Sequence, residues 1–341
     1  MKFKKLGNTD LKVSLICLGT MTWGKQNNQK EAFEQMDYAV SQGINFFDTA
    51  EMYAVPCTKE TFGKTEIIIG NWFKEKKNRE KIILATKVSG PGLSWIRGGD
   101  LQYTKRNITS AIEGSLKRLR TDYIDLYQLH RPSSIVPIEE TLDVLTDLIK
   151  QGKIRYIGCS THPAWKVAES IRISEKKHFS KIVTEQSPYN LLDRRIENEL
   201  IPMCEYYGLG LITWAPLAMG VLAGRYKKNE QTPKNSRAIL RGGFYADRVN
   251  ERGIEAGLKL NKIAENLGLT SAQLAVLWVK HQKGVTAPLI GPRTIKQLKE
   301  FIKIIDKSID ESVCELCDQI VPPGSAVADF YNTAPWMKMK I

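Results

Sequence analysis

The sequence has no long apolar run. None approaches the roughly 18 residues that span a bilayer, and the basic start at Met1 to Lys5 leads into polar turn residues, not into the apolar core of a signal peptide. We therefore expect a cytoplasmic protein without a membrane partner. An apolar fraction of 42% with 26% charged residues is typical of a folded protein with a large core.

Paired cysteines are also scarce. The six cysteines are scattered, and only Cys314 and Cys317 have C-x-x-C spacing. A zinc site would need a second such pair or a histidine pair, and a redox pair would need a preceding strand-to-helix turn. The pair lies instead in a charged segment with a helical pattern. We predict no metal site and expect reduced, unpaired thiols, with a metal or redox role as the minor alternative.

Acidic residues are outnumbered, 37 against 50 basic ones, which gives a net charge of +13. This excess favours anionic partners such as phosphates and raises nucleic-acid binding as an alternative. However, the basic runs are short and dispersed, aromatic residues do not interleave with them, and no helix-turn-helix or zinc-finger pattern occurs. Solvated surfaces explain these charges best, so no nucleic-acid partner is expected.

What the sequence does contain is a regular alternation of short apolar strands and amphipathic helices. Two alternating segments flank the turn residues Gly7 to Asp10, which predicts a small hairpin before a first buried strand that ends at Gly19-Thr20. Further strands are expected at 44–48, 81–88, 124–130, 154–160, 181–187, 210–215 and 286–291. Helices are expected at 29–42, 59–77, 104–119, 138–151, 163–178 and 193–207, and within 251–282.

Such alternation requires a parallel sheet, either an open doubly wound sheet or a closed barrel. The sequence lacks the G-x-G-x-x-G motif that a dinucleotide-binding open sheet carries after its first strand. Eight β/α pairs and a hairpin that can plug one end favour the α/β class and a TIM (β/α)8 barrel. We expect a single domain over residues 1–341, with C-terminal loops around the substrate opening.

Polar side chains stand at three adjacent predicted strand ends. Asp48 ends the second strand and is followed by Tyr53, while Lys87 and His130 end the third and fourth strands. These ends open onto one mouth of a TIM barrel. A tyrosine, with an ordinary pKa of about 10, can act as a general acid near neutral pH if a lysine lowers its pKa. An aspartate would keep that lysine charged, and a neutral histidine could orient a carbonyl oxygen.

Each residue also has an ordinary alternative. Asp48 could cap a helix, Lys87 could be a rim charge, His130 a core histidine and Tyr53 a packing aromatic. Their joint occurrence favours a reaction centre that protonates a developing alkoxide, and because no side chain supplies a hydride, a nicotinamide cofactor is implied. Glu51 receives no role in the chemistry and is expected to cap a helix or face solvent.

The motifs resemble those of the aldo-keto reductase family in order and spacing along the whole chain. The resemblance rests on residues 1–24, 47–53, 86–88 and 122–130. Residues 54–56, 70–72 and 87–91 are most similar to the bacterial Tas-type branch of that family. The resemblance implies reversible NADPH-dependent reduction of aldehydes or ketones. In this reaction Tyr53 would be the acid, Lys87 and Asp48 would tune it, and His130 would orient the carbonyl.

The resemblance also implies a cofactor site. Ser160 and Gln186 would hold the nicotinamide carboxamide, and Trp214 would stack on the nicotinamide ring, with an ordinary core tryptophan as the alternative. Arg293 follows the last strand, where TIM barrels bind phosphate, and is assigned to the 2′-phosphate, so NADP(H) is favoured over NAD(H). The remaining predicted cofactor contacts are Thr20, Pro216, Leu217, Gly220, Leu222, Arg225, Arg237, Gly291, Gln297 and Glu300.

Two positions depart from the family pattern. Phe301 stands where an adenine-contacting asparagine is common, and Thr161 where asparagine or arginine is common. We therefore expect departures from the family in the adenine contacts rather than in the chemistry.

Three aromatic or glycine-rich segments, 89–102, 227–250 and 322–341, are expected to surround the substrate opening, with Trp23 as a further candidate wall. They could equally be structural lids or subunit contacts. The patterns specify neither the carbonyl substrate nor the oligomeric state. A different class also remains open, a regulatory subunit on the same barrel that binds NADPH as a sensor.

Overall fold

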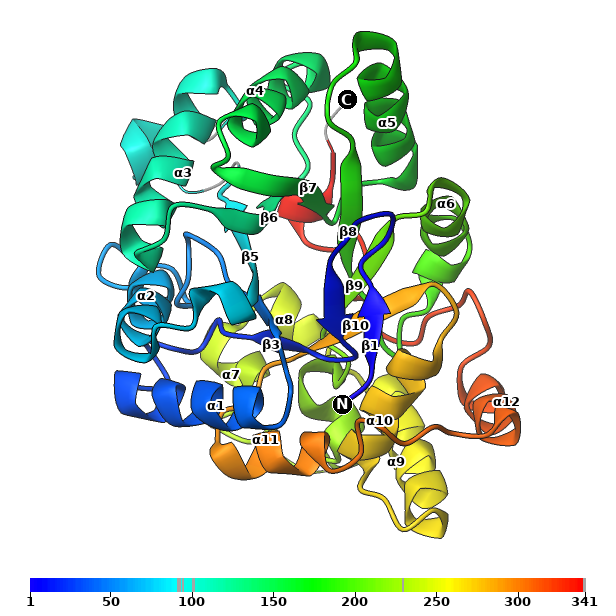
Figure 1. Ribbon diagram of the computed structural model, residues 1–341. Coiled ribbons are helices and arrows are strands. Elements are labelled where there is room, and N and C mark those ends of the chain that lie inside the picture. The colour runs from blue at the N-terminus through cyan, green and yellow to red at the C-terminus, as the bar shows by residue number, and fades with distance from the viewer. Residues whose placement is uncertain (91–92, 94, 100–101, 229, 340–341) are drawn as a thin grey trace.

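The computed structural model describes residues 1–341 except 91–92, 94, 100–101, 229 and 340–341. Small parts of the predicted segments 89–102, 227–250 and 322–341 therefore lie outside the described residues. Eight parallel strands close into a barrel, and helices surround it (Figure 1). The predicted TIM barrel is confirmed. In order along the chain its strands are β3 (Cys17–Gly19), β4 (Phe46–Asp48), β5 (Ile83–Val88), β6 (Ile124–Leu129), β7 (Ile154–Ser160), β8 (Ile182–Pro188), β9 (Gly210–Trp214) and β10 (Val285–Ile290).

Amphipathic helices cover the barrel, and side-chain caps mark where several of them begin. At α1 the Asn28 side chain accepts a hydrogen bond from the Glu31 backbone, while the Glu31 carboxylate accepts one from the Asn28 backbone. The helices are α1 (Gln29–Ser41), α2 (Lys64–Lys76), α3 (Lys105–Leu119), α4 (Ile138–Lys150), α5 (Ala164–Lys177), α6 (Leu200–Tyr207), α7 (Arg237–Arg241), α8 (Phe244–Asp247), α9 (Glu251–Asn266), α10 (Ser271–His281), α11 (Ile295–Ile302) and α12 (Glu311–Ile320).

Two predicted helices begin later than expected. The helix predicted at 59–77 begins at Lys64, because Gly63 before it has a φ of 73°, outside the helical region. The helix predicted at 193–207 is a short 3-10 turn followed by α6. Here Asp193 does not lie in the helix, because its carboxylate accepts hydrogen bonds from the backbone of the C-terminal segment, at Phe330 and Tyr331, each at 2.6 Å.

The N-terminal hairpin is present and closes one end of the barrel. Strands β1 (Phe3–Lys5) and β2 (Lys12–Ser14) pair antiparallel, and in Figure 1 they lie in front of the barrel strands. Apolar side chains of the hairpin region pack against inward-facing side chains of the barrel. This cluster consists of Leu6, Leu11, Val13, Cys17, Phe46, Ala85, Leu126, Ile212 and Ala287.

The interior of the barrel is layered, because alternate residues of a strand point to the same side. Phe46, Ala85 and Leu126 belong to the apolar cluster against the hairpin. One repeat further along the same three strands, the inward side chains are Asp48, Lys87 and Gln128, and they form a polar layer below the opposite mouth. Gln186 of β8 joins this layer through its hydrogen bond to Asp48.

Among the described residues, no helix is long and apolar enough to cross a membrane.

Candidate active site

Asp48 and Lys87 form a fully buried ion pair at the centre of the polar layer. The Lys87 Nζ donates to Asp48 Oδ1 at 2.5 Å and to the Thr49 carbonyl at 2.8 Å. The other carboxylate oxygen, Asp48 Oδ2, accepts from the side-chain amides of Gln186 at 2.8 Å and Gln128 at 3.1 Å. The carboxylate therefore has three side-chain donors, which is how a buried charge is held without solvent.

Gln128 was not among the residues predicted from the sequence. The sequence pattern that could have predicted it is the alternation of the fourth strand, which places Gln128 on the same side as Leu126 and His130. Gly158 on the neighbouring strand gives it room, since a Cβ at that glycine would lie 2.3 Å from Thr184 Oγ1 and 3.0 Å from Gln128 Cγ. A larger residue at position 158 would clash chiefly with Thr184 and would crowd Gln128.

Lys87 is charged although it is buried. Burial on its own lowers the pKa of this ammonium, but the neighbouring Asp48 carboxylate and Tyr53 phenol outweigh burial, and the pKa lies above its usual value. Asp48 therefore raises the pKa of Lys87, as expected from the sequence.

Tyr53 lies beside both Lys87 and His130. The Lys87 Nζ is 5.0 Å from the centre of the phenol ring, and the ring centres of Tyr53 and His130 are 5.9 Å apart in an edge-on arrangement. Burial raises the pKa of Tyr53, Lys87 lowers it, and burial prevails. The expectation of a net lowering is wrong in direction. The phenol instead keeps its proton at neutral pH, as a proton donor must.

His130 follows β6 and is neutral. Burial, together with the positive charges of Lys87 and Arg131, holds the pKa of the imidazole well below its usual range. Its Nδ1 is buried without a hydrogen-bond partner among the described residues. A neutral imidazole at this place can donate to or accept from a small polar group beside Tyr53.

Ser160 and Gln186 lie side by side on β7 and β8, where they are paired in register. The Ser160 hydroxyl donates to the Gln186 carbonyl at 2.8 Å. Trp214 is partly exposed at the end of β9, and the Arg248 guanidinium lies 5.9 Å from its ring centre. Thr20 is fully buried, and its hydroxyl donates to the Asp48 carbonyl at 2.8 Å. All four predicted cofactor residues therefore lie at the ends of barrel strands.

The segment after β9 is a tightly hydrogen-bonded turn that begins at the buried Pro216. The backbone N–H groups of Gly220 and Leu222 both donate to the Leu217 carbonyl, at 2.8 and 3.3 Å. Gly220 has a φ of 99°, which only glycine adopts without strain. The Leu222 side chain lies in the hydrophobic core, so only its backbone could meet a ligand.

Arg225 pairs with its own loop. Its guanidinium donates to the carbonyl and the side-chain oxygen of Asn235, at 2.9 and 2.6 Å.

Two predicted phosphate ligands come from distant segments. Arg237 begins α7, and burial lowers its pKa to about 10, helped by the positive charges of Arg241 and, to a smaller extent, Arg293. Arg293 is exposed before α11, where its backbone N–H donates to Gln297 Oε1 at 2.8 Å. Like charges that act on one another favour an anion such as phosphate beside them.

The remaining positions named for the cofactor site differ in exposure and in partners. Gly291 is exposed just before Arg293, and Glu300 on α11 accepts a hydrogen bond from Gln273 through its backbone carbonyl at 3.0 Å. Phe301 packs into the core with 7% exposure. Thr161 has a φ of 58°, and its hydroxyl donates to the Ser160 carbonyl at 2.7 Å.

Two expectations from the sequence are wrong. Trp23 is completely buried and its indole donates to Gln35 Oε1 at 3.2 Å, so it is a core residue and not a wall of the opening. Glu51 is also completely buried and pairs with Arg97 through both carboxylate oxygens, so it neither faces solvent nor caps a helix.

The predicted C-terminal segment reaches the same end of the barrel as His130. The Arg131 guanidinium lies 5.1 Å from the Trp336 ring centre. From the segment 227–250, the Arg248 guanidinium lies 5.9 Å from the ring centre of Trp214 at the end of β9. These contacts support the predicted position of both segments near the opening.

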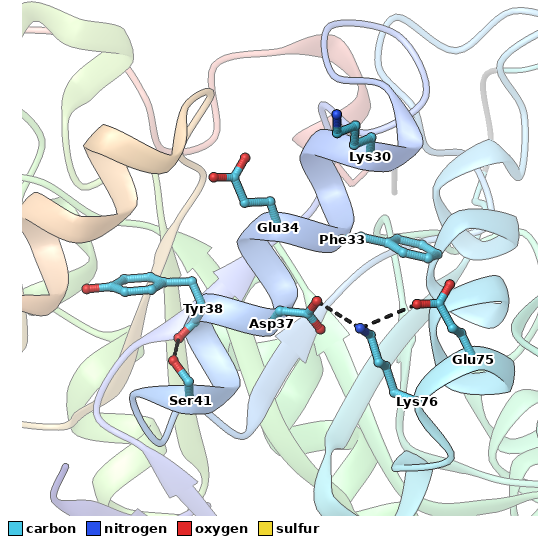
Figure 2. Close-up of a pocket in the computed structure, with 8 residues that line it drawn as sticks. All are labelled: Lys30, Phe33, Glu34, Asp37, Tyr38, Ser41, Glu75 and Lys76. Atoms are coloured by element: carbon cyan, nitrogen blue, oxygen red, sulfur yellow. Dashed lines mark hydrogen bonds and ion pairs between the residues drawn. The ribbon is translucent and has the colours of Figure 1, made fainter.

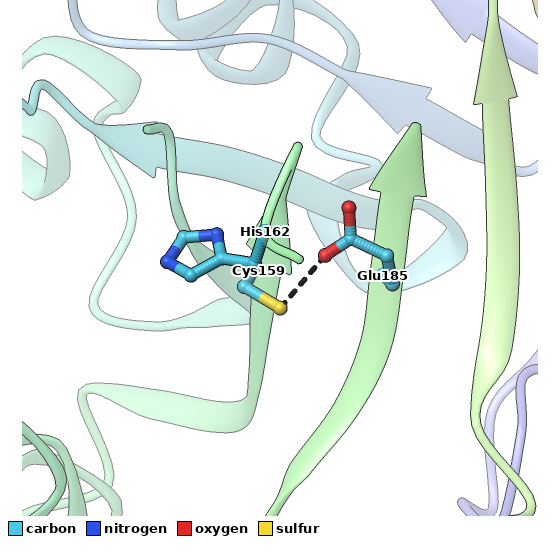
Figure 3. A group of neighbouring side chains, drawn as sticks. All are labelled: Cys159, His162 and Glu185. Carbon is cyan, nitrogen blue, oxygen red and sulfur yellow. Dashed lines mark hydrogen bonds between the residues drawn. The ribbon is translucent and has the colours of Figure 1, made fainter. Parts of the chain in front are cut away.

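Two groups of side chains offer donor atoms that could suit a metal ion. The first is buried and consists of Cys159 on β7, His162 just after β7 and Glu185 on β8, with donor atoms within 4.8 Å of one another (Figure 3). These atoms already pair: the Cys159 thiol donates to Glu185 Oε2 at 2.8 Å, and His162 Nδ1 lies 2.9 Å from the Ser160 carbonyl.

The second group, His281, Glu311 and Cys314, is largely exposed. It contains one cysteine of the C-x-x-C pair, and all six cysteines are unpaired thiols, as expected.

A surface groove lies between α1 and α2 (Figure 2). Lys76 of α2 pairs with Asp37 of α1 across it at 3.0 Å and with its neighbour Glu75 at 3.4 Å. None of the predicted site residues lines this groove. The strand ends remain the candidate site.

The fold and the four side chains at its mouth define a TIM-barrel oxidoreductase. The sequence model of the Aldo/keto reductase family matches residues 15–322, and the chain belongs to this family.

Relatives along nearly the whole chain agree. The uncharacterized oxidoreductase YrpG of Bacillus subtilis is 38% identical over 97% of this chain and 99% of its own, and protein tas of Escherichia coli is 38% identical over 92% and 95%. These support the Tas-type branch. A probable voltage-gated potassium channel subunit beta of Arabidopsis thaliana is 34% identical over 90% and 92%.

Proposed function

We propose that the protein is an NADPH-dependent reductase of aldehydes and ketones that acts reversibly. The observation that carries the proposal is the contact chain Asp48–Lys87–Tyr53, with His130 beside the phenol. A bound nicotinamide would supply the hydride. The chain's own residues then need only to hold the carbonyl and provide one proton.

Tyr53 is the proton donor in this proposal. As negative charge develops on the carbonyl oxygen, the phenol proton moves to it, and the Lys87 ammonium stabilises the phenolate that is left. Asp48 keeps that ammonium charged and in place through its 2.5 Å contact. His130, being neutral, donates a hydrogen bond to the same oxygen without competing as an acid.

The cofactor residues fit NADP(H). Ser160 and Gln186 present amide and hydroxyl groups at adjacent strand ends, and Trp214 offers a partly exposed aromatic face beside them. Arg237 at the start of α7 and Arg293 before α11 are positive charges that repel each other, which suits the 2′-phosphate that distinguishes NADP(H) from NAD(H).

The test is reduction of a panel of reactive aldehydes, followed by the loss of NADPH absorbance. Wild type should oxidise NADPH, and Tyr53→Phe should lower kcat by about 100-fold or more, which is within the usual range for a lost general acid. Binding of NADPH should not change, because the phenol does not hold the cofactor. No turnover by wild type, or an undiminished rate in Tyr53→Phe, contradicts the proposal.

A second candidate is an NADPH-binding regulatory subunit with little turnover. The similarity to proteins named as probable voltage-gated potassium channel beta subunits favours it. It predicts tight cofactor binding, negligible turnover on every aldehyde and a stable protein partner in a pull-down. The complete set of Tyr53, Lys87, Asp48 and His130 favours the reductase, because a sensor needs no proton donor.

A further inference from the structure

Glu51 is a buried carboxylate whose side chain joins two segments of the mouth. Its Oε1 accepts from the Ser89 backbone at 2.6 Å and from Arg97 Nη2 at 2.8 Å, and its Oε2 accepts from Arg97 Nη1 at 2.6 Å. Both Ser89 and Arg97 belong to the segment 89–102. Two parallel N–H···O bonds between a guanidinium and a carboxylate fix orientation as well as distance.

The backbone of Glu51 is equally engaged. Its N–H donates to the Lys87 carbonyl at 3.2 Å, and its carbonyl accepts from Gly63 at 2.9 Å. The next contacts along the chain belong to Tyr53, whose N–H donates to the Ala50 carbonyl at 3.0 Å. Glu51 therefore fixes the short segment that carries Tyr53 directly to the strand of Lys87.

Arg97 is held on its other side as well. Its Nε donates to Asn107 Oδ1 on α3 at 2.5 Å, and nearby in the chain Trp95 packs edge-on against Phe62 at 5.8 Å. Phe62 lies between Tyr53 and α2. Arg97 and Trp95 are thus held by one charged and one aromatic contact to the same stretch of chain that presents Tyr53.

We propose that Glu51 is a positioning residue that holds the Tyr53 hydroxyl in a fixed position relative to Ser89 and Arg97 of the segment 89–102. This inference rests on the proposed reductase function. Loss of the charge would leave the Arg97 guanidinium with a weaker partner and loosen both segments together. A misplacement of about 1 Å in reacting groups can cost on the order of 100-fold in rate.

A second buried carboxylate provides a matched control. Glu66 does not serve, because its partner Arg118 also lies 4.0 Å from Glu51 Oε2. Asp125 at the start of β6 is 2% exposed, and like Glu51 it accepts from guanidinium groups and from a backbone N–H. Its donors are Arg79 Nη2 at 2.8 Å, Arg155 Nη1 at 2.9 Å and the Leu84 backbone at 3.0 Å. These partners lie at the starts of β5 and β7 and before β5, away from Ser89 and Arg97, so Asp125 reports the cost of a lost buried charge without the proposed positioning effect.

The experiment compares Glu51→Gln with Asp125→Asn. We expect kcat to fall by about 10- to 100-fold in Glu51→Gln and by less than about 3-fold in Asp125→Asn, although both variants lose stability in urea. The Kd for NADPH should stay within about 2-fold of wild type in both variants, because neither carboxylate reaches the cofactor residues. Arg97→Lys, which keeps the charge, should retain more activity than Arg97→Met, and Arg97→Met should add little to Glu51→Gln.

Equal kcat values in Glu51→Gln and Asp125→Asn overturn the inference and leave the reductase proposal intact. If wild type turns over no aldehyde, hydrogen–deuterium exchange decides instead. Glu51→Gln should then speed exchange both in the peptide that contains Tyr53 and in the peptide that contains Arg97, and Asp125→Asn should not. Unchanged exchange in those peptides overturns the inference independently of catalysis.

Discussion

The Lys87 ammonium lies 2.5 Å from the Asp48 carboxylate, and neither side chain reaches solvent. A buried pair of this kind is not a source of stability in itself, because both charges lose their hydration. Its value here is that Lys87 stays charged directly beside Tyr53. The pair therefore supplies the positive charge of the candidate site, and its effect on the free energy of unfolding can be measured.

Removing one partner should destabilise the folded protein strongly, and removing the second partner as well should add little further loss. Lys87→Met and Asp48→Asn should each lower the free energy of unfolding by about 3–5 kcal/mol, because a charge or its donors are left buried without a partner. The double variant should lose less than the sum of the two. Urea denaturation followed by tryptophan fluorescence measures all three.

The exposed pair of Lys181 and Glu175 serves as the control for this cycle. Its two atoms lie 2.7 Å apart, but both side chains are about half exposed. Lys181→Met should therefore change stability by less than about 1 kcal/mol. Strict additivity of Lys87→Met and Asp48→Asn would show that the two side chains do not depend on each other.

The neutral state of His130 predicts the shape of the pH profile. Because burial, Lys87 and Arg131 hold its pKa well below the usual range, the imidazole should stay neutral throughout the neutral range. The kcat/KM for aldehyde reduction should then show no loss attributable to this histidine between about pH 6 and 8. His130→Gln, which keeps a neutral hydrogen-bonding group, should retain more activity than His130→Leu. A limb near pH 6.5 that disappears in His130→Gln would contradict this account.

Arg237 and Arg293 should discriminate between the two nicotinamide cofactors. Arg237→Met and Arg293→Ala should each weaken NADPH binding by about 10- to 100-fold, the usual size of a lost charge-assisted hydrogen bond, and should change NADH binding little. Fluorescence titration with both cofactors measures the effect. Lys296→Ala is the control, since Lys296 is exposed on the same helix start. Equal affinities of wild type for NADPH and NADH would remove the basis for the assignment.

The barrel and the main side chains of the mouth were predictable because their signals are local. Asp48, Lys87 and His130 each end a short apolar strand, and the period of the strand decides which way they point. The burial of Glu51 was not predictable, because it depends on Arg97, which arrives from a separate loop. The net pKa of Tyr53 also depends on burial, which no neighbour in the sequence reveals.

The same distinction holds for the cofactor side. The position of Arg293 after the last strand follows from the order of elements, whereas its proximity to Arg237 requires α7 to fold back over the barrel end. Trp23 was predicted to line the opening because it is a large aromatic residue, but its indole donates to the buried Gln35 side chain. Contacts between distant segments were the ones that sequence patterns missed.

Glu185 predicts a pH dependence of stability that is independent of catalysis. Burial raises its pKa from 4.5 to about 7, although the Cys159 thiol and the Ser187 hydroxyl donate to the carboxylate and oppose the rise. The folded protein thus binds this proton more tightly than the unfolded chain. The resulting stabilisation is fully present below a pH of about 4.5 and is lost as the pH rises through about 7.

The change Glu185→Gln mimics the protonated carboxyl and should remove this dependence. Wild type should lose on the order of 3 kcal/mol relative to Glu185→Gln between about pH 5 and pH 8, as follows from a pKa rise of this size. Urea denaturation of both proteins at the two pH values measures the difference. Glu169→Gln, at a surface pair with Lys166, should run parallel to wild type at both. If the stability difference between wild type and Glu185→Gln is the same at both pH values, the carboxyl does not change its protonation in this range, and the hydrogen bonds from Cys159 and Ser187 outweigh burial.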